Sequence, residues 1–316
     1  MKAIVTGASG FIGSRLVAKL VSGGYKVAAI GRKRQSQILD FRKRFLEGAT
    51  YIEVDLDEIN RLEEILLLEG FHGKALKFFF HLAWGGRCKL SDLDVDSQSK
   101  NVARTVDTYN LAGSLGAERY IFSGTMEEAF GEKYTMLDYK VESKYNRHVV
   151  YALAKIAARN ALRIEYRKGT PDILFGTNSH VMGPGDDKDS FLQMALLKML
   201  QGENVSMSSG EQIFDVINVS DCAEAYVRIA ESGINLSSYW IGSGSPKQLR
   251  DYVIEMNQMY PNSSICFGSQ PFNDVVLEKS IFSTELLAKD TGFYPYLSFS
   301  DSVLELAEYL KSVILP

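Results

Sequence analysis

A tyrosine and a lysine stand four positions apart in the sequence YALAK, at Tyr151 and Lys155. In a helix this spacing places both side chains on one face, one turn apart. A phenol has a pKa of about 10 and exchanges protons poorly near neutral pH, but a neighbouring ammonium favours the phenolate and brings the group toward the working range. The pair therefore predicts a general acid or base, Tyr151, that is tuned by Lys155.

A second group of residues has the composition of a phosphate-binding turn. Three glycines are spaced G-x-x-G-x-x-G in TGASGFIG, between a short apolar strand and a helix with one apolar face. Glycine there permits a tight turn, a close approach of the backbone to a pyrophosphate, and close packing of the helix. The start of the helix offers free N–H groups to the phosphates. The residues expected to bind a dinucleotide are Gly7, Ser9, Gly10, Phe11, Ile12 and Gly13.

Strand-like and helix-like runs must position these residues, and they alternate through the first half of the chain. Six apolar strands are expected at residues 3–5, 27–30, 51–54, 78–82, 120–122 and 172–175. Apolar strands that are each followed by a helix predict a parallel sheet covered on both faces. We expect an α/β fold with a doubly wound Rossmann domain over residues 1–176. A smaller substrate lobe is expected over residues 177–316, with segments that return to the main sheet.

The bulk composition narrows the function classes. Of 316 residues, 46% are hydrophobic and 23% charged, and the formal net charge is −4, which argues against nucleic acid as a partner. The sequence has no run of about 18 apolar residues, so no membrane span is predicted. Its first residues predict a strand and not a signal peptide. Cys88, Cys222 and Cys266 are too widely spaced to predict a metal site or a disulfide framework. A cytoplasmic enzyme without a metal is expected.

The segment after the second strand indicates the cofactor. NAD-binding domains carry an acidic residue there for the ribose hydroxyls. Here the sequence is Gly31-Arg32-Lys33-Arg34, with no carboxylate near. Arg32 stands where a 2′-phosphate would lie, so NADP(H) is expected in preference to NAD. Lys33, Arg34 and the later run Arg42-Lys43-Arg44 are either phosphate ligands or solvated surface.

The glycine spacing resembles that of the short-chain dehydrogenase/reductase superfamily. The motif TGASGFIG resembles that of its extended branch, the NAD-dependent epimerase/dehydratase family. The resemblance extends over nearly the whole chain. It implies that Asp55 and Leu56 meet the adenine, and that the backbone of Leu82 and Ala83 lines the cofactor. His81, which precedes them, is interpreted as a packed histidine without chemistry.

The same resemblance implies roles around the Tyr–Lys pair. Lys155 would also hold the cofactor ribose, Ser123 would lie beside the nicotinamide, and Thr125 would hydrogen-bond the substrate carbonyl. Dehydratases of this family often carry an acid pair after that threonine. Here Met126 replaces the first acid. The segment is also one residue longer than usual, so the sequence leaves open whether Glu127 or Glu128 corresponds to the second acid. One of the two is expected to be solvated.

Further positions resemble substrate-contacting segments of the family. Trp84 follows the residues His81-Leu82-Ala83, differs from the residue usual in the family at that place, and is expected to face substrate. Phe214 replaces an arginine that usually meets the nucleotide diphosphate, and aromatics there resemble the CDP- and dTDP-sugar 4-ketoreductase-like members. The substrate-binding residues expected are Trp84, Thr125, Glu127, Asn178, Phe191 and Phe214.

The leading expectation is an NADPH-dependent reductase of a keto group on a nucleotide-linked sugar of the 4-keto-6-deoxy type, with Tyr151 as the general acid. One alternative is a nucleotide-sugar 4-epimerase or dehydratase that retains NAD(P). A second alternative is a non-catalytic NADP(H)-binding regulator. The resemblance also implies a homodimer.

Overall fold

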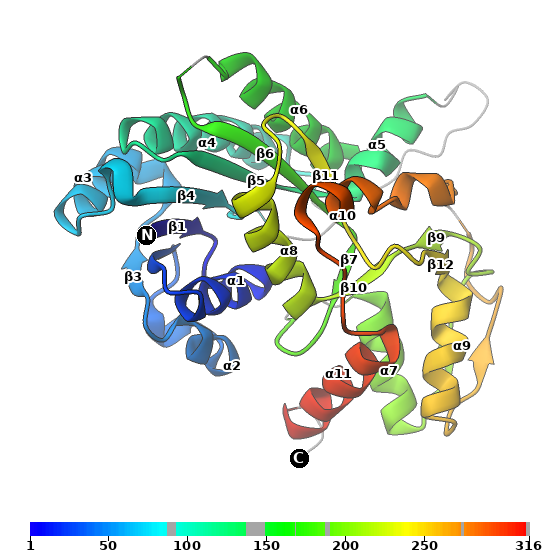
Figure 1. Ribbon diagram of the computed structural model, residues 1–316. Coiled ribbons are helices and arrows are strands. Elements are labelled where there is room, and N and C mark those ends of the chain that lie inside the picture. The colour runs from blue at the N-terminus through cyan, green and yellow to red at the C-terminus, as the bar shows by residue number, and fades with distance from the viewer. Residues whose placement is uncertain (87–92, 137–148, 168, 187–189, 273–274, 314–316) are drawn as a thin grey trace.

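A seven-stranded parallel sheet forms the centre of the computed structural model (Figure 1). The structure describes all residues except 87–92, 137–148, 168, 187–189, 273–274 and 314–316, so Cys88 lies outside the described residues. The strand order is β11-β6-β5-β4-β1-β2-β3. The strands are β1 Lys2–Thr6, β2 Lys26–Gly31, β3 Thr50–Glu53, β4 Leu76–His81, β5 Arg119–Thr125, β6 Asp172–Asn178 and β11 Ser238–Ile241. The α/β doubly wound fold expected from the sequence is confirmed.

Helices cover both faces of this sheet because its strands are apolar on both sides. The helices of one face are α1 Phe11–Ser22, α8 Val219–Ser232 and α10 Glu285–Thr291. The helices of the other face are α3 Ile59–Leu68, α4 Val95–Ser114 and α6 Val149–Glu165. Successive residues of β1 show the division, because Ala3 and Val5 join the first core and Ile4 joins the second.

The C-terminal part of the chain forms a third core beside the sheet. Figure 1 shows α7, α9 and α11 lying together below it. These helices are α7 Phe191–Gln201, α9 Leu249–Met259 and α11 Phe299–Val313. Short strand pairs join them: β7 His180–Met182 with β10 Val216–Asn218, β8 Val205–Ser206 with β13 Ile265–Cys266, and β9 Ile213–Phe214 with β12 Lys247–Gln248.

The chain crosses between these two parts more than once. The predicted boundary at residue 176 falls inside β6, which continues to Asn178. The later elements α8, β11 and α10 belong to the sheet and its cover. The seventh strand, β11, and the helix α5 Glu127–Thr135 are not among the expected elements. The remaining elements are α2 Asp40–Lys43, η1 Gln35–Gln37, η2 Arg44–Leu46, η3 Leu56–Glu58, η4 Gly73–Ala75 and η5 Lys279–Phe282.

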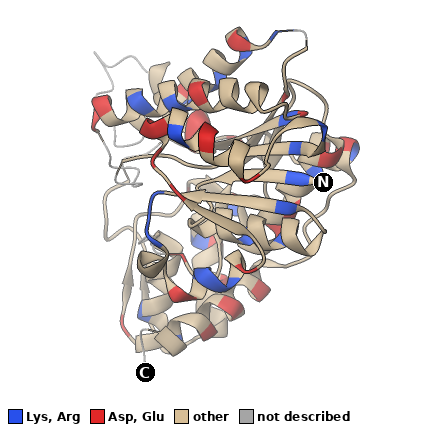
Figure 2. Cartoon of the chain, turned by 90° about the vertical axis from the view of Figure 1, so that its left-hand side faces the viewer, with Lys and Arg blue, Asp and Glu red and all other residues tan. Residues whose placement is uncertain are grey.

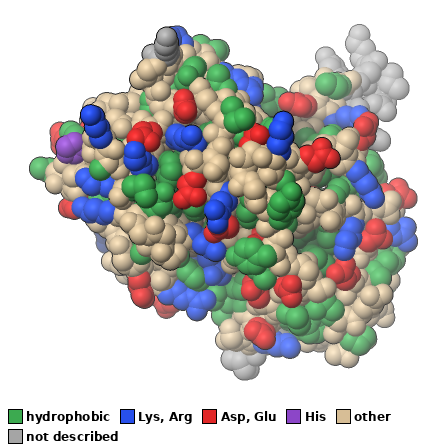
Figure 3. All heavy atoms as spheres, viewed as in Figure 1, with side chains coloured by type: hydrophobic (Ala, Val, Ile, Leu, Met, Phe, Trp, Pro, Cys, Tyr) green, Lys and Arg blue, Asp and Glu red, His purple; other side chains and the backbone are tan. Residues whose placement is uncertain are grey.

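Basic and acidic residues are interspersed over the helices and strands (Figure 2). The face seen in Figure 3 likewise mixes acidic, basic and apolar side chains. Within the described ranges, no helix combines the length and the apolar character needed to cross a bilayer.

Candidate active site

The carboxyl ends of the parallel strands meet at one edge of the sheet, the edge at which open α/β folds bind ligands. The glycine turn follows β1, Arg32 follows β2, Asp55 follows β3, and Thr125 ends β5. The strand order reverses between β1 and β4, so the crevice expected for a dinucleotide lies there.

The turn after β1 leaves room for a phosphate group. Gly7 has φ +71°, and a Cβ there would lie 2.7 Å from the backbone nitrogen of Ala83, so a side chain would close the gap between the two loops. A Cβ on Gly13 would collide with the carbonyl oxygen of Gly7. Helix α1 starts at Phe11, after Gly10, and no side chain caps its first N–H groups. These features fit a pyrophosphate bound at the helix start.

The end of β4 touches this turn. The backbone N–H of Ala83 lies 3.4 Å from the Thr6 hydroxyl, which is also 3.0 Å from His81 Nδ1. His81 is 2% exposed and its other ring nitrogen lies 3.3 Å from the Thr105 hydroxyl. Burial, and next the Lys155 ammonium, lower the pKa of His81 to about 3, so the ring is neutral at physiological pH. This is the packed histidine that the sequence suggested.

Lys155 and Tyr151 project from one face of α6 toward the ends of β4 and β5. Lys155 Nζ donates to the carbonyl oxygen of Ser123 at 2.7 Å and lies 3.7 Å from the centre of the Trp84 indole. The rings of Trp84 and Tyr151 meet edge to face, with centres 6.1 Å apart. Lys155 is 4% exposed, and the Ser123 carbonyl and the aromatic faces contribute to stabilising its buried charge. The structure brings Trp84, Tyr151, Lys155 and Ser123 into one cluster.

Side chains of α4 hold the Trp84 segment, a feature that the sequence reasoning missed. The indole N–H of Trp84 donates to Gln98 Oε1 at 2.8 Å. Asn101, one turn further, accepts from the N–H of Gly85 at 2.8 Å and donates to its carbonyl at 3.0 Å. The spacing of Gln98 and Asn101 is the only signal in the sequence that they share a helix face.

Asn178 and Ser123 belong to a buried network beneath this cluster. The Asn178 amide donates to Ser123 Oγ at 3.0 Å and to the Gly124 carbonyl at 3.1 Å, and its oxygen accepts from Tyr226 at 2.9 Å. Tyr226 also lies 2.8 Å from Ser123 Oγ, and burial raises the pKa of its phenol. Because both amide hydrogens of Asn178 are used inside the protein, the structure does not support its expected contact with substrate. The hydroxyl of Ser123 is likewise held in this network rather than displayed toward a nicotinamide.

The structure separates the two glutamates that follow Thr125. Glu128 pairs with Arg159 and accepts the backbone N–H of Thr125, whereas the N–H of Glu127 lies 3.4 Å from the Thr125 hydroxyl. Glu127 is 3% exposed and Glu128 7%, so the expectation that one of them is solvated is wrong. Helix α5 begins at Glu127 and buries both side chains, with that of Glu128 held against α6 and β5.

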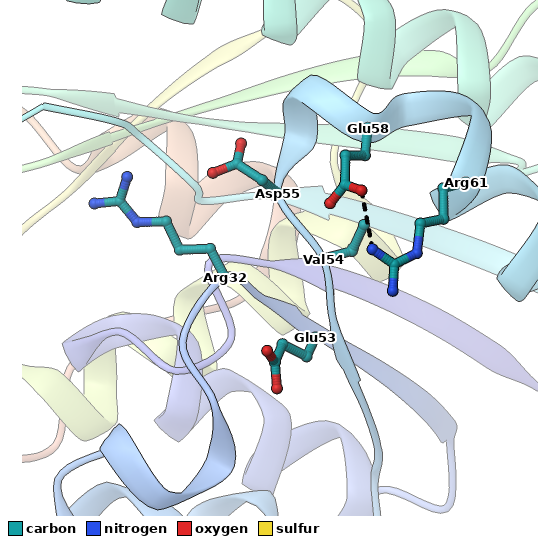
Figure 4. Close-up of a pocket in the computed structure, with 6 residues that line it drawn as sticks. All are labelled: Arg32, Glu53, Val54, Asp55, Glu58 and Arg61. Carbon is teal, nitrogen blue, oxygen red and sulfur yellow. Dashed lines mark hydrogen bonds and ion pairs between the residues drawn. The ribbon is translucent and has the colours of Figure 1, made fainter.

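Arg32 lines a hollow of about 470 Å³ at the ends of β2 and β3 (Figure 4). Val54 and four other charged residues complete it: Glu53, Asp55, Glu58 and Arg61. No carboxylate follows β2 directly in the sequence, but β3 and η3 bring three carboxylates to the hollow that Arg32 lines. Each of the three has a cationic neighbour: Arg34 lies 3.9 Å from Glu53, Arg104 3.5 Å from Asp55 and Arg61 2.9 Å from Glu58.

Arg32 differs from the other charged residues of this hollow. It is exposed, and among the described residues it makes no hydrogen bond or ion pair. The second basic run behaves differently, because Arg42 is 4% exposed and its Nε donates to the carbonyl of Gly185 at 2.8 Å. Arg42 therefore fixes the segment after β7 beside the glycine turn and is not a solvated residue.

The two phenylalanines expected at the substrate differ in their burial and in their neighbours. Phe214 is half-buried on β9, with its ring centre 6.5 Å from that of Phe130 and 6.3 Å from that of His180. It packs with α5, the helix that carries Glu127. Phe191 is 38% exposed at the start of α7, and in the described part of the chain no hydrogen bond, ion pair or ring contact joins it to the cluster around Lys155.

Comparison with known proteins identifies the family. The sequence profile of the NAD dependent epimerase/dehydratase family matches residues 3–242. The chain is 29% identical over 317 aligned positions to CDP-abequose synthase of Salmonella typhimurium, with 97% of each chain covered. It is 27% identical to dTDP-6-deoxy-L-talose 4-dehydrogenase (NAD(+)) of Aggregatibacter actinomycetemcomitans, over 81% of this chain and 89% of that one.

A solved structure agrees in fold. The UDP-glucose 4-epimerase of Thermotoga maritima superposes with a TM-score of 0.78 at 20% identity, covering 99% of this chain and 100% of that chain. Since the profile spans the glycine turn, the Tyr–Lys helix and the whole central sheet, the protein belongs to the NAD dependent epimerase/dehydratase family and is an enzyme of the extended short-chain dehydrogenase/reductase type.

Proposed function

We propose that this enzyme uses NADPH to reduce a keto group on a nucleotide-linked sugar. The observation that carries the proposal is the cluster of Tyr151, Lys155 and Trp84 at the same strand edge as the glycine turn. A bound NADPH supplies a hydride at this edge, and the protein must then supply a proton and orient the carbonyl.

The proton comes from Tyr151 in this proposal. Its phenol stands one turn before Lys155 on α6, and the Trp84 ring borders both side chains. A buried ammonium favours the phenolate that remains after proton transfer, which lowers the barrier to donation. Lys155 also hydrogen-bonds Ser123, so its direction is fixed relative to β5. Thr125, two residues further at the end of β5, would donate its hydroxyl to the substrate carbonyl.

The choice of NADPH rests on Arg32. A 2′-phosphate adds negative charge at the adenosine ribose, and a guanidinium binds phosphate oxygens through two parallel hydrogen bonds. Of the two arginines that line the hollow, Arg61 is paired with Glu58, so Arg32 is the lining cation that could bind an added phosphate. Gly7, Gly10 and Gly13 would hold the pyrophosphate, with Ser9, Phe11 and Ile12 between them. Asp55, Leu56, Leu82 and Ala83 would line the rest of the cofactor.

The names of the two curated relatives support the substrate class, since both carry a nucleotide prefix and one denotes chemistry at C4 of a deoxysugar. On this chain Phe214 is half-buried on β9 and packs against the buried Phe130 of α5, so an apolar sugar face could pack on the Phe214 ring. Glu127 favours a second candidate, a dehydratase, because a buried carboxylate near Thr125 could move a proton. The homodimer remains an expectation from the family resemblance, and the cytoplasmic location remains an expectation from the sequence.

The test is turnover with NADPH on a panel of CDP- and dTDP-linked 4-keto-6-deoxy sugars. One NADPH oxidised per sugar reduced is the expected result. A product formed without net change of cofactor would instead indicate an epimerase or dehydratase. Tight NADPH binding with no product from any panel member would refute the reductase and favour a regulator.

A further inference from the structure

A buried ion pair lies directly beside the end of β5. Arg159 Nε donates to Glu128 Oε2 at 2.8 Å, and Arg159 Nη2 donates to Glu128 Oε1 at 3.2 Å. Glu128 is 7% and Arg159 9% exposed, so both charges are withdrawn from water. A two-pronged arginine–carboxylate contact of this kind fixes the relative orientation of both groups.

Glu128 also binds Thr125, a residue with a role in the proposed reaction. Its Oε1 also accepts the backbone N–H of Thr125 at 2.9 Å. Thr125 is the residue that would polarise the substrate carbonyl. A carboxylate held by a guanidinium therefore anchors the backbone of the residue whose hydroxyl must meet the substrate.

Arg159 is itself held on its remaining side. Its Nη2 donates to Thr177 Oγ1 at 3.0 Å and its Nη1 donates to Ser238 Oγ at 2.8 Å. Its guanidinium carbon lies 5.0 Å from the centre of the Phe175 ring. The pair thus connects α5 and α6 to strands β6 and β11, and each of the three guanidinium nitrogens donates at least one hydrogen bond, as a buried charge requires.

The backbone next to Thr125 is shaped around this pair. A Cβ on Gly124 would lie 2.5 Å from Glu128 Oε1 and 2.6 Å from Arg159 Nη2. Any side chain at position 124 would push the two groups away, because the third near contact is the backbone carbonyl of Gly176 at 3.1 Å. The glycine between Ser123 and Thr125 is therefore a requirement of the ion pair.

Helix α6 connects the pair to the general acid. Tyr151, Lys155 and Arg159 follow one another at four-residue intervals along one face of α6. Lys155 binds the carbonyl of Ser123 directly, and Arg159 reaches the N–H of Thr125 through Glu128. Lys155 and Arg159, on the same face of α6, therefore both fix the position of the end of β5 relative to Tyr151.

We propose that Glu128 and Arg159 are positioning residues that hold the Thr125 hydroxyl in register with Tyr151. This inference rests on the reductase function proposed above. It assigns Glu128 no proton transfer, since its oxygens are occupied by Arg159 and by Thr125, and it leaves Glu127 as the carboxylate of this segment that could face substrate.

Two double variants separate anchoring from charge pairing. Glu128→Ala with Arg159→Ala removes both charges and the acceptor for Thr125. Glu128→Gln with Arg159→Ala removes both charges and keeps an amide oxygen as that acceptor. Neither leaves an isolated buried charge, which is the main reason a single variant would unfold. Arg163→Ala is the matched control, because Arg163 is exposed one turn further on α6 and lies 5.1 Å from the same Phe175 ring.

The assay uses the full chain, NADPH and whichever panel sugar the wild type reduces. The alanine pair is expected to lower kcat about 10- to 100-fold, the scale of a misplaced reacting group, with the KM for NADPH within about twofold. The primary isotope effect with NADPH deuterated at the transferred position should rise as the chemical step slows. The glutamine pair should recover kcat to within about fivefold of Arg163→Ala, since an amide–carbonyl hydrogen bond replaces the charged one. A merely structural role would lower the active fraction and leave the isotope effect unchanged.

Equal kcat in both double variants and the control would overturn the assignment, as would equal losses in both with no change of isotope effect. Should the alanine pair fail to fold, Gly124→Ala tests the same geometry with both charges in place, against Gly113→Ala, whose Cβ would meet Pro171 at an ordinary 3.6 Å. Unchanged kcat in Gly124→Ala then overturns it. A wild type that reduces no panel sugar refutes the proposed function and this inference together, whereas failure of the inference alone leaves wild-type turnover intact.

Discussion

Replacing Arg32 by alanine should change which cofactor the enzyme prefers. Arg32 is exposed at the rim of the hollow formed by the ends of β2 and β3, and among the described residues it has no ion-pair partner to lose. The variant should therefore fold as the wild type does, and any loss should appear only when a 2′-phosphate is bound.

The magnitude follows from one charge-assisted contact at an exposed position. Hydrogen bonds to charged groups contribute about 1.5–3 kcal/mol, and solvent screening favours the lower part of that range here. About 1.5–2 kcal/mol corresponds to a 10- to 30-fold weaker Kd for NADPH, because about 1.4 kcal/mol is a factor of ten. The Kd for NADH should change less than about twofold, since NADH has no 2′-phosphate.

Both dissociation constants can be measured by titrating the fluorescence of the reduced nicotinamide, without knowledge of the substrate. Arg34→Ala is the control, because Arg34 lies 3.9 Å from Glu53 and both side chains are exposed. It should alter the NADPH-to-NADH ratio by less than about twofold. A ratio that is the same in Arg32→Ala as in the wild type would refute the reading of Arg32 as the phosphate ligand.

Three further perturbations test the cluster around Lys155. Tyr151→Phe should lower turnover at least about 100-fold with the Kd for NADPH nearly unchanged, the usual scale for loss of a general acid; retained turnover would exclude that role. Trp84→Ala should reduce kcat/KM about 2- to 30-fold, the range of a cation–π contact. Trp84→Phe should retain most of the wild-type kcat/KM. Equal losses of kcat/KM in Trp84→Ala and Trp84→Phe would point to packing alone. His81 has its pKa lowered to about 3 in the folded state, so the unfolded chain binds its proton first and stability should fall as pH drops from about 6.5 toward 3, by at most about 1.4 kcal/mol per pH unit. Urea unfolding at several pH values should show a shallower acid slope for His81→Gln, and identical slopes would mean that His81 does not titrate on unfolding.

The sequence was sufficient for features that depend on local spacing. The six strands of the first half, the glycine turn and the Tyr151–Lys155 face follow from periodicity and from the glycine pattern, because each is a property of neighbouring residues. The helix α5 was not predicted, since its sequence EEAFGEKYT carries few apolar residues at helical spacing. The strand β11 was missed because its pairing with β6 depends on a return from a distant part of the chain.

Contacts between distant segments account for the other differences. Three carboxylates reach Arg32 from β3 and η3, which follow it in sequence by some twenty residues, so a search for an acid next to β2 could not find them. The amide of Asn178 binds Ser123, Gly124 and Tyr226, partners that the pairing of β5 with β6 and the packing of α8 bring together. Residue type indicated what these groups could bind, and the packing decided what they do bind.

The two glutamates after Thr125 now allow a sharper choice between reduction and dehydration. Loss of water needs one proton removed and another delivered, and the pairing of Glu128 with Arg159 leaves Glu127 to do this with Tyr151. A reductase needs only the proton of Tyr151. Glu127→Gln should therefore lower reduction by less than about tenfold, because an amide of the same size replaces a carboxyl without an essential proton transfer. In a dehydratase the same change should abolish product, at a cost of at least about 100-fold. Product assay by mass, which separates loss of water from gain of two hydrogens, decides the outcome; loss of NADPH-dependent reduction in Glu127→Gln would contradict the role of Tyr151 as sole proton donor.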